Sequence, residues 1–115
     1  MGIRANGMGR ARRRLEELAD RIAGATEKAI DEFADEVVDH MQGVVPVDTG
    51  KLRMSIKKER EGNRVTVGPR GVDYAEHVEN GTSRSPAQPY VAPTMQWAQQ
   101  VGPARIARKI EGVIE

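Results

Sequence analysis

A chain of 115 residues with a net charge of +1 and 30% charged residues has room for one domain, whose core must be thin because it contains one Trp, one Phe and two Tyr. The absence of cysteine excludes disulfides and thiolate metal sites. No apolar run approaches the roughly 20 residues of a membrane span and no signal-peptide pattern follows the first residue, so we expect a soluble protein used without secretion.

The first nine residues contain three glycines and no apolar periodicity, so we predict a flexible arm over residues 1–9 and a single domain over residues 10–115. This end of the chain is basic, because residues 1–14 contain five arginines and no acid. Phosphate contact needs only such charge and flexibility, which makes Arg10, Arg12, Arg13 and Arg14 candidates for contact with DNA or another partner. A solubilising arm would explain the same pattern.

Residues 11–44 are predicted to form one long helix, because apolar side chains recur at spacings of three and four residues. The stripe comprises Leu15, Leu18, Ile22, Ala25, Ala29, Phe33, Val37, Met41 and Val44. Acids crowd the opposite face. The helix would span about 50 Å, and Pro46 ends it.

A β-hairpin is predicted next, after a turn at residues 48–50 in which Gly50 takes a positive φ. Apolar and polar residues alternate over residues 52–57, which is typical of a half-buried strand with a basic outer face. Residues 61–63 (EGN) form the turn, and residues 64–68 return as the second strand. The inward side chains of the two strands are Leu52, Met54, Ile56, Val65 and Val67.

Residues 72–78 fit either a third strand or a short helical turn, and the spacing of Tyr74 and Val78 slightly favours the helix. After a proline-rich loop, a second helix is predicted to begin near residue 93, with Gly102-Pro103 kinking or splitting it. Its apolar stripe comprises Met95, Ala98, Val101, Ile106, Ile110 and Val113. The element order predicts an α+β fold with a long N-terminal helix, a small antiparallel sheet built on the hairpin, and a C-terminal helix packed on the sheet.

Charge is segregated into blocks along these elements. Residues 16–39 carry nine acids against two bases, whereas residues 51–70 carry seven bases against two acids. Blocks of opposite sign serve complementary contacts between subunits, where they steer association and set the register. They are equally typical of solvated helix faces.

The strongest enzymatic signal is Asp48-Thr49-Gly50, which resembles the catalytic segment of the aspartic proteases, where two carboxylates share a proton. A helical pattern precedes it where an all-β fold is required, and Lys51 stands where a small residue is expected. We therefore interpret Asp48, Thr49 and Gly50 as a structural turn and expect no enzyme. His40 and His77 lack metal-ligand spacing, so no metal or other cofactor is expected.

Three separate segments stand out in this order along the chain: PVDTGKLRMSI at residues 46–56, YAEHVENGT at residues 74–82 and AQPYVAP at residues 87–93. Together they resemble a family of tailed-phage tail-component and neck proteins, known as head–tail joining or tail-completion proteins. Residues 46–56 (PVDTGKLRMSI) are similar to its P-x-D-T-G-x-L-R-x-S-I segment, and residues 74–82 (YAEHVENGT) to Y-A-x-x-V-E-x-G-T. Residues 87–93 (AQPYVAP) are similar to A-Q-P-F-hydrophobic-x-P, with Tyr90 in place of the usual Phe. The resemblance runs from about residue 37 to residue 100, in the family's order.

The resemblance implies a structural virion protein without catalysis, assembled in the host cytoplasm, that forms a ring around the DNA channel at the head–tail junction as a neck, tail-completion or tail-terminator protein. A cyclic homo-oligomer is expected, with a hexamer favoured and a dodecamer possible, next to connector or stopper and tail-tube proteins. The stretch of residues 72–93, which contains the proline-rich loop, would then be a subunit interface in which Tyr90 anchors in a neighbour's pocket. The interface residues are Tyr74, Glu79, Thr82, Arg84, Gln88, Pro89 and Tyr90.

The main alternative is a small protein that binds nucleic acid without sequence specificity. It would use the basic arm, with Arg10, Arg12, Arg13 and Arg14 neutralising phosphates. No interleaved aromatic residues accompany these arginines, so base recognition is not expected.

Overall fold

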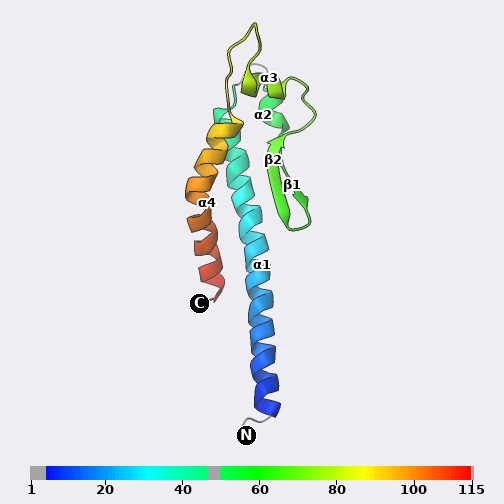
Figure 1. Ribbon diagram of the computed structural model, residues 1–115, viewed down its shortest axis with the longest axis vertical. Helices are drawn as coiled ribbons and strands as arrows, with labels where there is room; N and C mark the ends of the chain where they lie inside the picture. The colour runs from blue at the N-terminus through cyan, green and yellow to red at the C-terminus, as the bar shows by residue number, and fades with distance from the viewer. Residues whose placement is uncertain (1–4, 47–49, 115) are drawn as a thin grey trace.

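The computed structural model describes residues 5–46 and 50–114, and within them four helices and two strands form an elongated molecule of 78 × 24 × 21 Å (Figure 1). In chain order the elements are α1 (Ala5–Val44), α2 (Lys51–Ser55), β1 (Ile56–Glu61), β2 (Arg64–Pro69), α3 (Ala75–Asn80) and α4 (Val91–Ile114). The α+β class is confirmed. Among the described residues, no helix has the length and apolarity that a membrane crossing requires.

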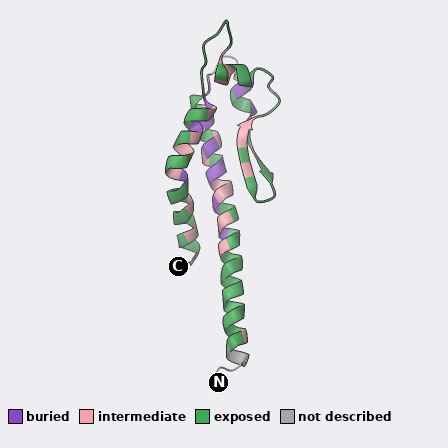
Figure 2. Ribbon diagram, in the orientation of Figure 1, coloured by how far each residue is buried: buried purple, intermediate pink, exposed green. Residues whose placement is uncertain are grey.

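Helix α1 is the axis of the molecule, and its 40 residues correspond to about 60 Å. It begins at Ala5, so residues 5–9 of the expected arm are helical, while residues 1–4 lie outside the described part of the chain. Burial divides the helix in two (Figure 2): its apolar stripe is buried from Ala25 to Met41 but exposed towards the N-terminus. At the other end Val44, expected in the stripe, is exposed and Val45 is buried instead, because the helix has ended and the chain turns inward.

Helix α4 runs back along the C-terminal half of α1, and α1 lies between α4 and the hairpin (Figure 1). The main partner of α4 is therefore α1 rather than the expected sheet, because the two-stranded sheet is narrow and uses Val65 and Val67 against α1. The helix continues through Pro103, so it is not split there. Its predicted apolar positions are half-buried, with the exception of Val113, which is 42% exposed.

Some residues of the acidic and basic blocks form ion pairs with each other within the chain. From the hairpin, Lys58 Nζ lies 2.9 Å from carboxylate oxygens of both Asp31 and Asp35 on α1. From α4, Arg105 pairs with Glu36 at 2.8 Å and Lys109 with Glu32 at 2.6 Å. Exposed pairs of this kind contribute little to stability, because water and salt screen their charges. Their effect is to hold the hairpin and α4 in register on the two sides of α1.

The hairpin is confirmed, but its first strand starts later than the alternating pattern predicted. Residues 51–55 form α2, and only Ile56 onwards is strand, paired with β2 through a two-residue turn between Glu61 and Arg64. The strand interpretation of residues 52–55 was wrong because one helical turn also brings Leu52, Ser55 and Ile56 to the same side, where all three are buried. Met54, which alternation placed inward, is 77% exposed.

Two short-range features stabilise α2. Gly50 has φ 81°, which confirms its predicted positive φ, and its carbonyl accepts the Met54 N–H at 3.0 Å. The buried Ser55 hydroxyl donates to the Leu52 carbonyl at 2.6 Å. Asp48 and Thr49, the other two residues of the predicted turn, lie outside the described residues.

The core lies at the loop end of the molecule, where six elements converge. Its buried members are Met41, Val45, Leu52, Ile56, Ala75 and Tyr90. The favoured helical interpretation is confirmed for residues 75–78, since α3 begins at Ala75 and buries that residue, whereas residues 72–74 precede the helix. Aliphatic side chains and one tyrosine therefore build a core as thin as the composition predicted.

Candidate functional site

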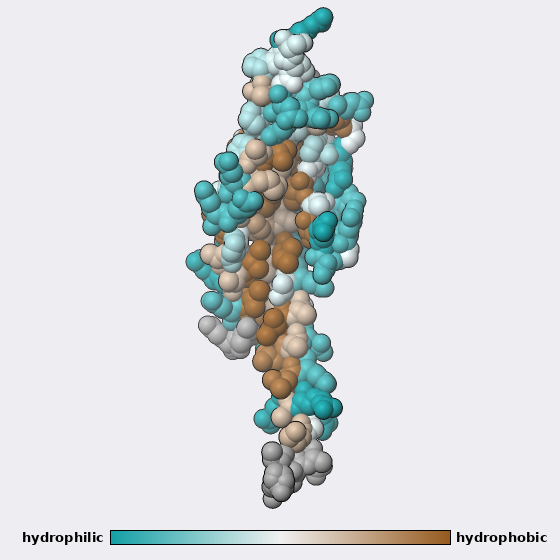
Figure 3. All heavy atoms as spheres, viewed as in Figure 1, coloured by the Kyte–Doolittle hydropathy of each residue, from teal (hydrophilic) through white to brown (hydrophobic). Residues whose placement is uncertain are grey.

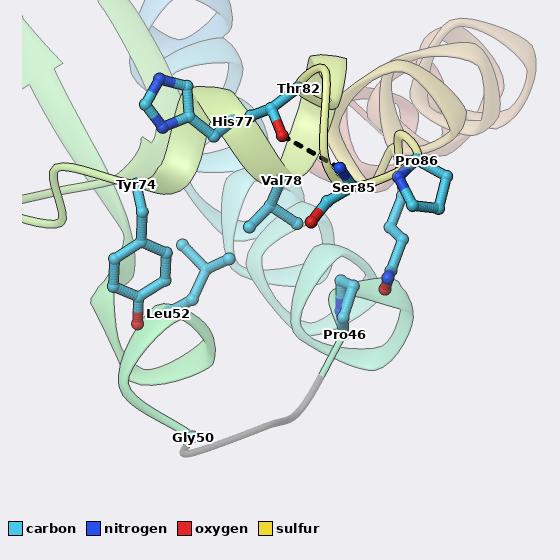
Figure 4. Close-up of a pocket in the computed structure, with 10 residues that line it drawn as sticks. Pro46, Gly50, Leu52, Tyr74, His77, Val78, Thr82, Ser85 and Pro86 are labelled. Carbon is cyan, nitrogen blue, oxygen red and sulfur yellow. Dashed lines mark hydrogen bonds between the residues drawn. The ribbon is translucent and has the colours of Figure 1, made fainter.

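The α2–α3 pocket, a cavity of about 510 Å³, opens at the loop end of the molecule (Figure 4). It is lined by Pro46, Gly50, Leu52, Tyr74, His77, Val78, Thr82, Ser85, Pro86 and Gln88. Apolar side chains of Leu52, Val78 and Pro46 point into it, and Thr82 and Ser85 lie at its rim (Figure 4). Its described lining contains no carboxylate, so the pocket offers an apolar surface with a polar rim rather than an acid–base pair.

The loop between α3 and α4 is held by its own hydrogen bonds. Gly81 ends α3 with φ 77°, and its N–H donates to the His77 carbonyl at 2.8 Å. The Thr82 hydroxyl accepts the N–H groups of Arg84 at 3.1 Å and Ser85 at 3.0 Å, which forms a compact turn. Further along, the Gln88 N–H donates to the Val78 carbonyl at 2.8 Å. The loop therefore presents its exposed side chains from an ordered backbone.

Glu79 caps the N-terminus of α4 from a neighbouring helix. Its carboxylate accepts the N–H groups of Tyr90 at 2.8 Å, Val91 at 2.7 Å and Ala92 at 3.1 Å. Partial burial acts to raise the pKa of Glu79, but the three backbone donors outweigh it, so the pKa lies below its usual value. Sequence reasoning assigned Glu79 to an interface and missed this role, because capping patterns are recognised within a few residues and this cap acts across 13 residues.

Tyr90, expected to anchor in a neighbouring subunit, belongs to the core of its own chain. Its side chain is 1% exposed, and its hydroxyl donates to the Ala75 carbonyl at 3.3 Å. Burial, followed by the nearby charge of Glu79, raises the pKa of Tyr90. The expectation fails because Glu79 draws the start of α4 against α3, and this places the ring inside.

The other predicted interface residues remain accessible at the loop end. Tyr74, at the edge of the pocket, is 39% exposed. Thr82, Arg84, Gln88 and Pro89 are all exposed. The fold thus brings together the five predicted residues that another molecule could reach, and it uses Glu79 and Tyr90 to support them from within.

The other candidate residues lie elsewhere. Arg10, Arg12, Arg13 and Arg14 are exposed on the N-terminal half of α1. This half of α1 projects away from the end of the molecule that carries α2 and α3 (Figure 1). His40 stacks on Trp97 with ring centroids 4.1 Å apart, whereas His77 lines the pocket. Within residues 5–46 and 50–114, no group of three His, Cys, Asp or Glu side chains could hold a metal ion.

We expect Glu79→Gln to destabilise the protein by about 1 kcal/mol near neutral pH, the usual contribution of a helix cap. A carboxyl group with a lowered pKa in the folded state stabilises the fold above its unfolded pKa, and the contribution disappears as the pH falls through the folded pKa. The Glu79 contribution should therefore be complete at neutral pH and lost below the ordinary value of 4.5. Urea titrations at neutral pH and about pH 3 should show a smaller acid-induced loss of stability in the variant. A profile parallel to that of the wild type would contradict the capping role.

Comparison with known families adds an independent finding. The model of the HK97-gp10-like bacteriophage tail-component family matches residues 10–81. The matched region runs from α1 to the end of α3 and includes the similar segments at residues 46–56 and most of 74–82. No curated protein and no solved structure matches the chain significantly.

Proposed function

The chain belongs to the HK97-gp10-like bacteriophage tail-component family, and from this premise we propose that it forms a ring around the DNA channel at the head–tail junction. The family is a family of structural components rather than a class of enzymes. A phage tail component is associated with the virion. The neck, tail-completion or tail-terminator position and the ring itself are our proposal.

The observation that supports a ring is the unlike character of the two ends of the subunit. One end carries the ordered loop and the α2–α3 pocket, and the other is a single projecting helix with exposed apolar and basic side chains. A loop end that packs on a different surface of the next copy, and not on that copy's own loop end, makes a heterologous contact, and a heterologous contact that closes on itself gives a cyclic oligomer. A hexamer is the favoured state and a dodecamer the alternative.

The loop end is our proposed subunit interface. Its accessible residues are Tyr74, Thr82, Arg84, Gln88 and Pro89. The apolar floor of the pocket and an exposed tyrosine suit a buried contact, and the polar rim suits its edge. Connector or stopper proteins on one side of the ring and the tail-tube protein on the other are the expected neighbours.

Contact with packaged DNA is a second role that one observation favours. Arg10, Arg12, Arg13 and Arg14 are exposed on α1, and within the described residues none of their side chains has a hydrogen-bond or ion-pair partner. Such groups neutralise phosphates without reading sequence. They would act from within the ring, or alone in a protein that binds nucleic acid non-specifically.

A double variant tests the interface. Tyr74→Ala with Arg84→Glu changes two exposed side chains, so its melting temperature should stay close to that of the wild type. Its incorporation into particles should fall by about tenfold or more if both side chains lie in a subunit contact. Arg108→Glu, an exposed charge change on α4, is the control and should assemble normally.

Electron microscopy of particles that contain the wild-type protein tests its position. Averaged images should show six or twelve copies in a ring between head and tail. Copies distributed along the tail tube would contradict the position at the head–tail junction. Normal assembly of the Tyr74→Ala/Arg84→Glu variant would contradict the subunit interface at the loop end.

A further inference from the structure

The N-terminal half of α1 carries an apolar face that nothing in its own chain covers. Met8 is 58% exposed, Leu15 67% and Leu18 36%, and Ile22 is half-buried. Helix α4 covers α1 only as far as about Ile22. Near this point the Arg21 guanidinium donates to the carbonyl of Val113, at the end of α4, at 2.9 Å. A band of apolar atoms follows α1 and continues past the end of α4 (Figure 3). Exposed apolar stretches of this kind mark interaction sites.

The spacing of this face indicates what kind of surface covers it. Positions 8, 11, 15, 18 and 22 alternate in steps of three and four, and Ala25 and Ala29 continue the series where it is buried. A stripe of this strict spacing is the narrow seam of a coiled coil, whereas helices that lie on a membrane need a broader apolar face. Gly9, Ala11 and Ala19 leave a hollow beside Met8 and Leu15 that could receive a side chain of a packed helix.

The charges that flank the seam indicate the charge expected on a helix that packs against it. In heptad terms Arg12 and Arg14 border the seam on its two sides, whereas Arg10 and Arg13 face away from it. In the buried half of α1 the signs are reversed: Glu32 and Glu36 of α1 pair with Lys109 and Arg105 of α4. The chain thus already closes one helix–helix seam with flanking ion pairs.

We propose that residues 8–22 of α1 bind an amphipathic helix of another protein, with acidic residues beside its apolar seam. The contact goes beyond the proposed ring, since it uses the end of the molecule opposite the pocket. A second copy of the same helix fits less well, because a parallel pair places Arg12 of one copy on the same side of the seam as Arg14 of the other, and an antiparallel pair places Arg14 beside Arg21. DNA would use the arginines but leave Leu15 and Leu18 exposed to water.

The test uses the full-length protein and two labelled synthetic peptides of three heptads. Both have Leu at the seam positions; one has Glu at all flanking positions and the other Lys. Fluorescence anisotropy at low salt should show that the Glu peptide binds about tenfold more tightly than the Lys peptide and weakens as salt is added. Leu15→Gln with Leu18→Gln should abolish binding, while circular dichroism stays unchanged because both residues are exposed.

Matched charge variants distinguish a specific effect of the arginines beside the seam from a general effect of net charge. Arg12→Glu with Arg14→Glu should reverse the preference between the two peptides. Arg10→Glu with Arg13→Glu makes the same change in net charge on the outer face and should keep the Glu preference. Equal effects of the two double variants would overturn the proposal.

Failure to bind either peptide, or equal affinity for both, would also overturn it. In that case, a dimer in sedimentation that Leu15→Gln/Leu18→Gln abolishes would assign the seam to a second copy. Seam-dependent binding to phosphatidylserine vesicles would assign it to a membrane, and equal loss of duplex DNA binding in both charge variants would assign the arginines to DNA. None of these results depends on ring formation, so failure here leaves the proposed ring standing.

Discussion

Replacing Tyr90 with alanine should lower the free energy of unfolding by about 3–5 kcal/mol, the usual cost of removing a large buried aromatic side chain. The ring is 1% exposed and packs in a core cluster that also contains Met41, Ile56 and Ala75. Its loss leaves a cavity where α3, α4 and α1 meet, and the hydroxyl's hydrogen bond to the Ala75 carbonyl is lost as well. Urea or thermal unfolding of the isolated protein measures the effect.

Two further variants make the result specific. Tyr90→Phe keeps the ring and removes only the 3.3 Å hydrogen bond, so it should cost about 1 kcal/mol. Tyr74→Ala removes a ring that is 39% exposed and should change stability by no more than about 0.5 kcal/mol. If Tyr90→Ala unfolded like the wild type and failed only in assembly, the original expectation of an intersubunit anchor would be correct.

Replacing Gly81 with alanine should destabilise the fold by about 3 kcal/mol, because strain and a collision act together. Gly81 has φ 77° and ψ 174°, a backbone conformation that essentially only glycine adopts. A Cβ atom there would lie 2.6 Å from the Ala87 backbone nitrogen. Backbone cannot swing aside like a side-chain tip, so the loop that leads to Tyr90 must move.

Gly71→Ala is the matched control. Gly71 also has a positive φ, of 70°, but among the described residues no heavy atom other than those of Gly71 and its chain neighbours lies within 4 Å of the position that its Cβ would take. It should therefore show backbone strain alone, about 1–2 kcal/mol. Equal losses in the two variants would mean that the contact with Ala87 carries no energy and that the loop adapts freely.

The sequence by itself determined the framework of this protein and its family. The long helix is readable because apolar residues keep a helical spacing over many turns and Pro46 marks its end. The hairpin turn is readable because Glu61-Gly62-Asn63 separates two short runs typical of strands, and in the structure Gly62 has a positive φ of 63°. The segments at residues 46–56 and 74–82 pointed to the tail-component family, and the match over residues 10–81 confirms it.

Tertiary structure alone decided which of the candidate side chains face outward. Alternation over residues 52–57 is too short to distinguish a strand from one helical turn, and packing on Met41 and Tyr90 selected the helix. Glu79 acts on Tyr90, Val91 and Ala92 through a contact that no local pattern encodes. The apolar seam of α1 looks continuous in sequence. Its first two heptads are nevertheless exposed because α4 ends before it reaches them, and burial depends on a partner helix and not on the spacing itself.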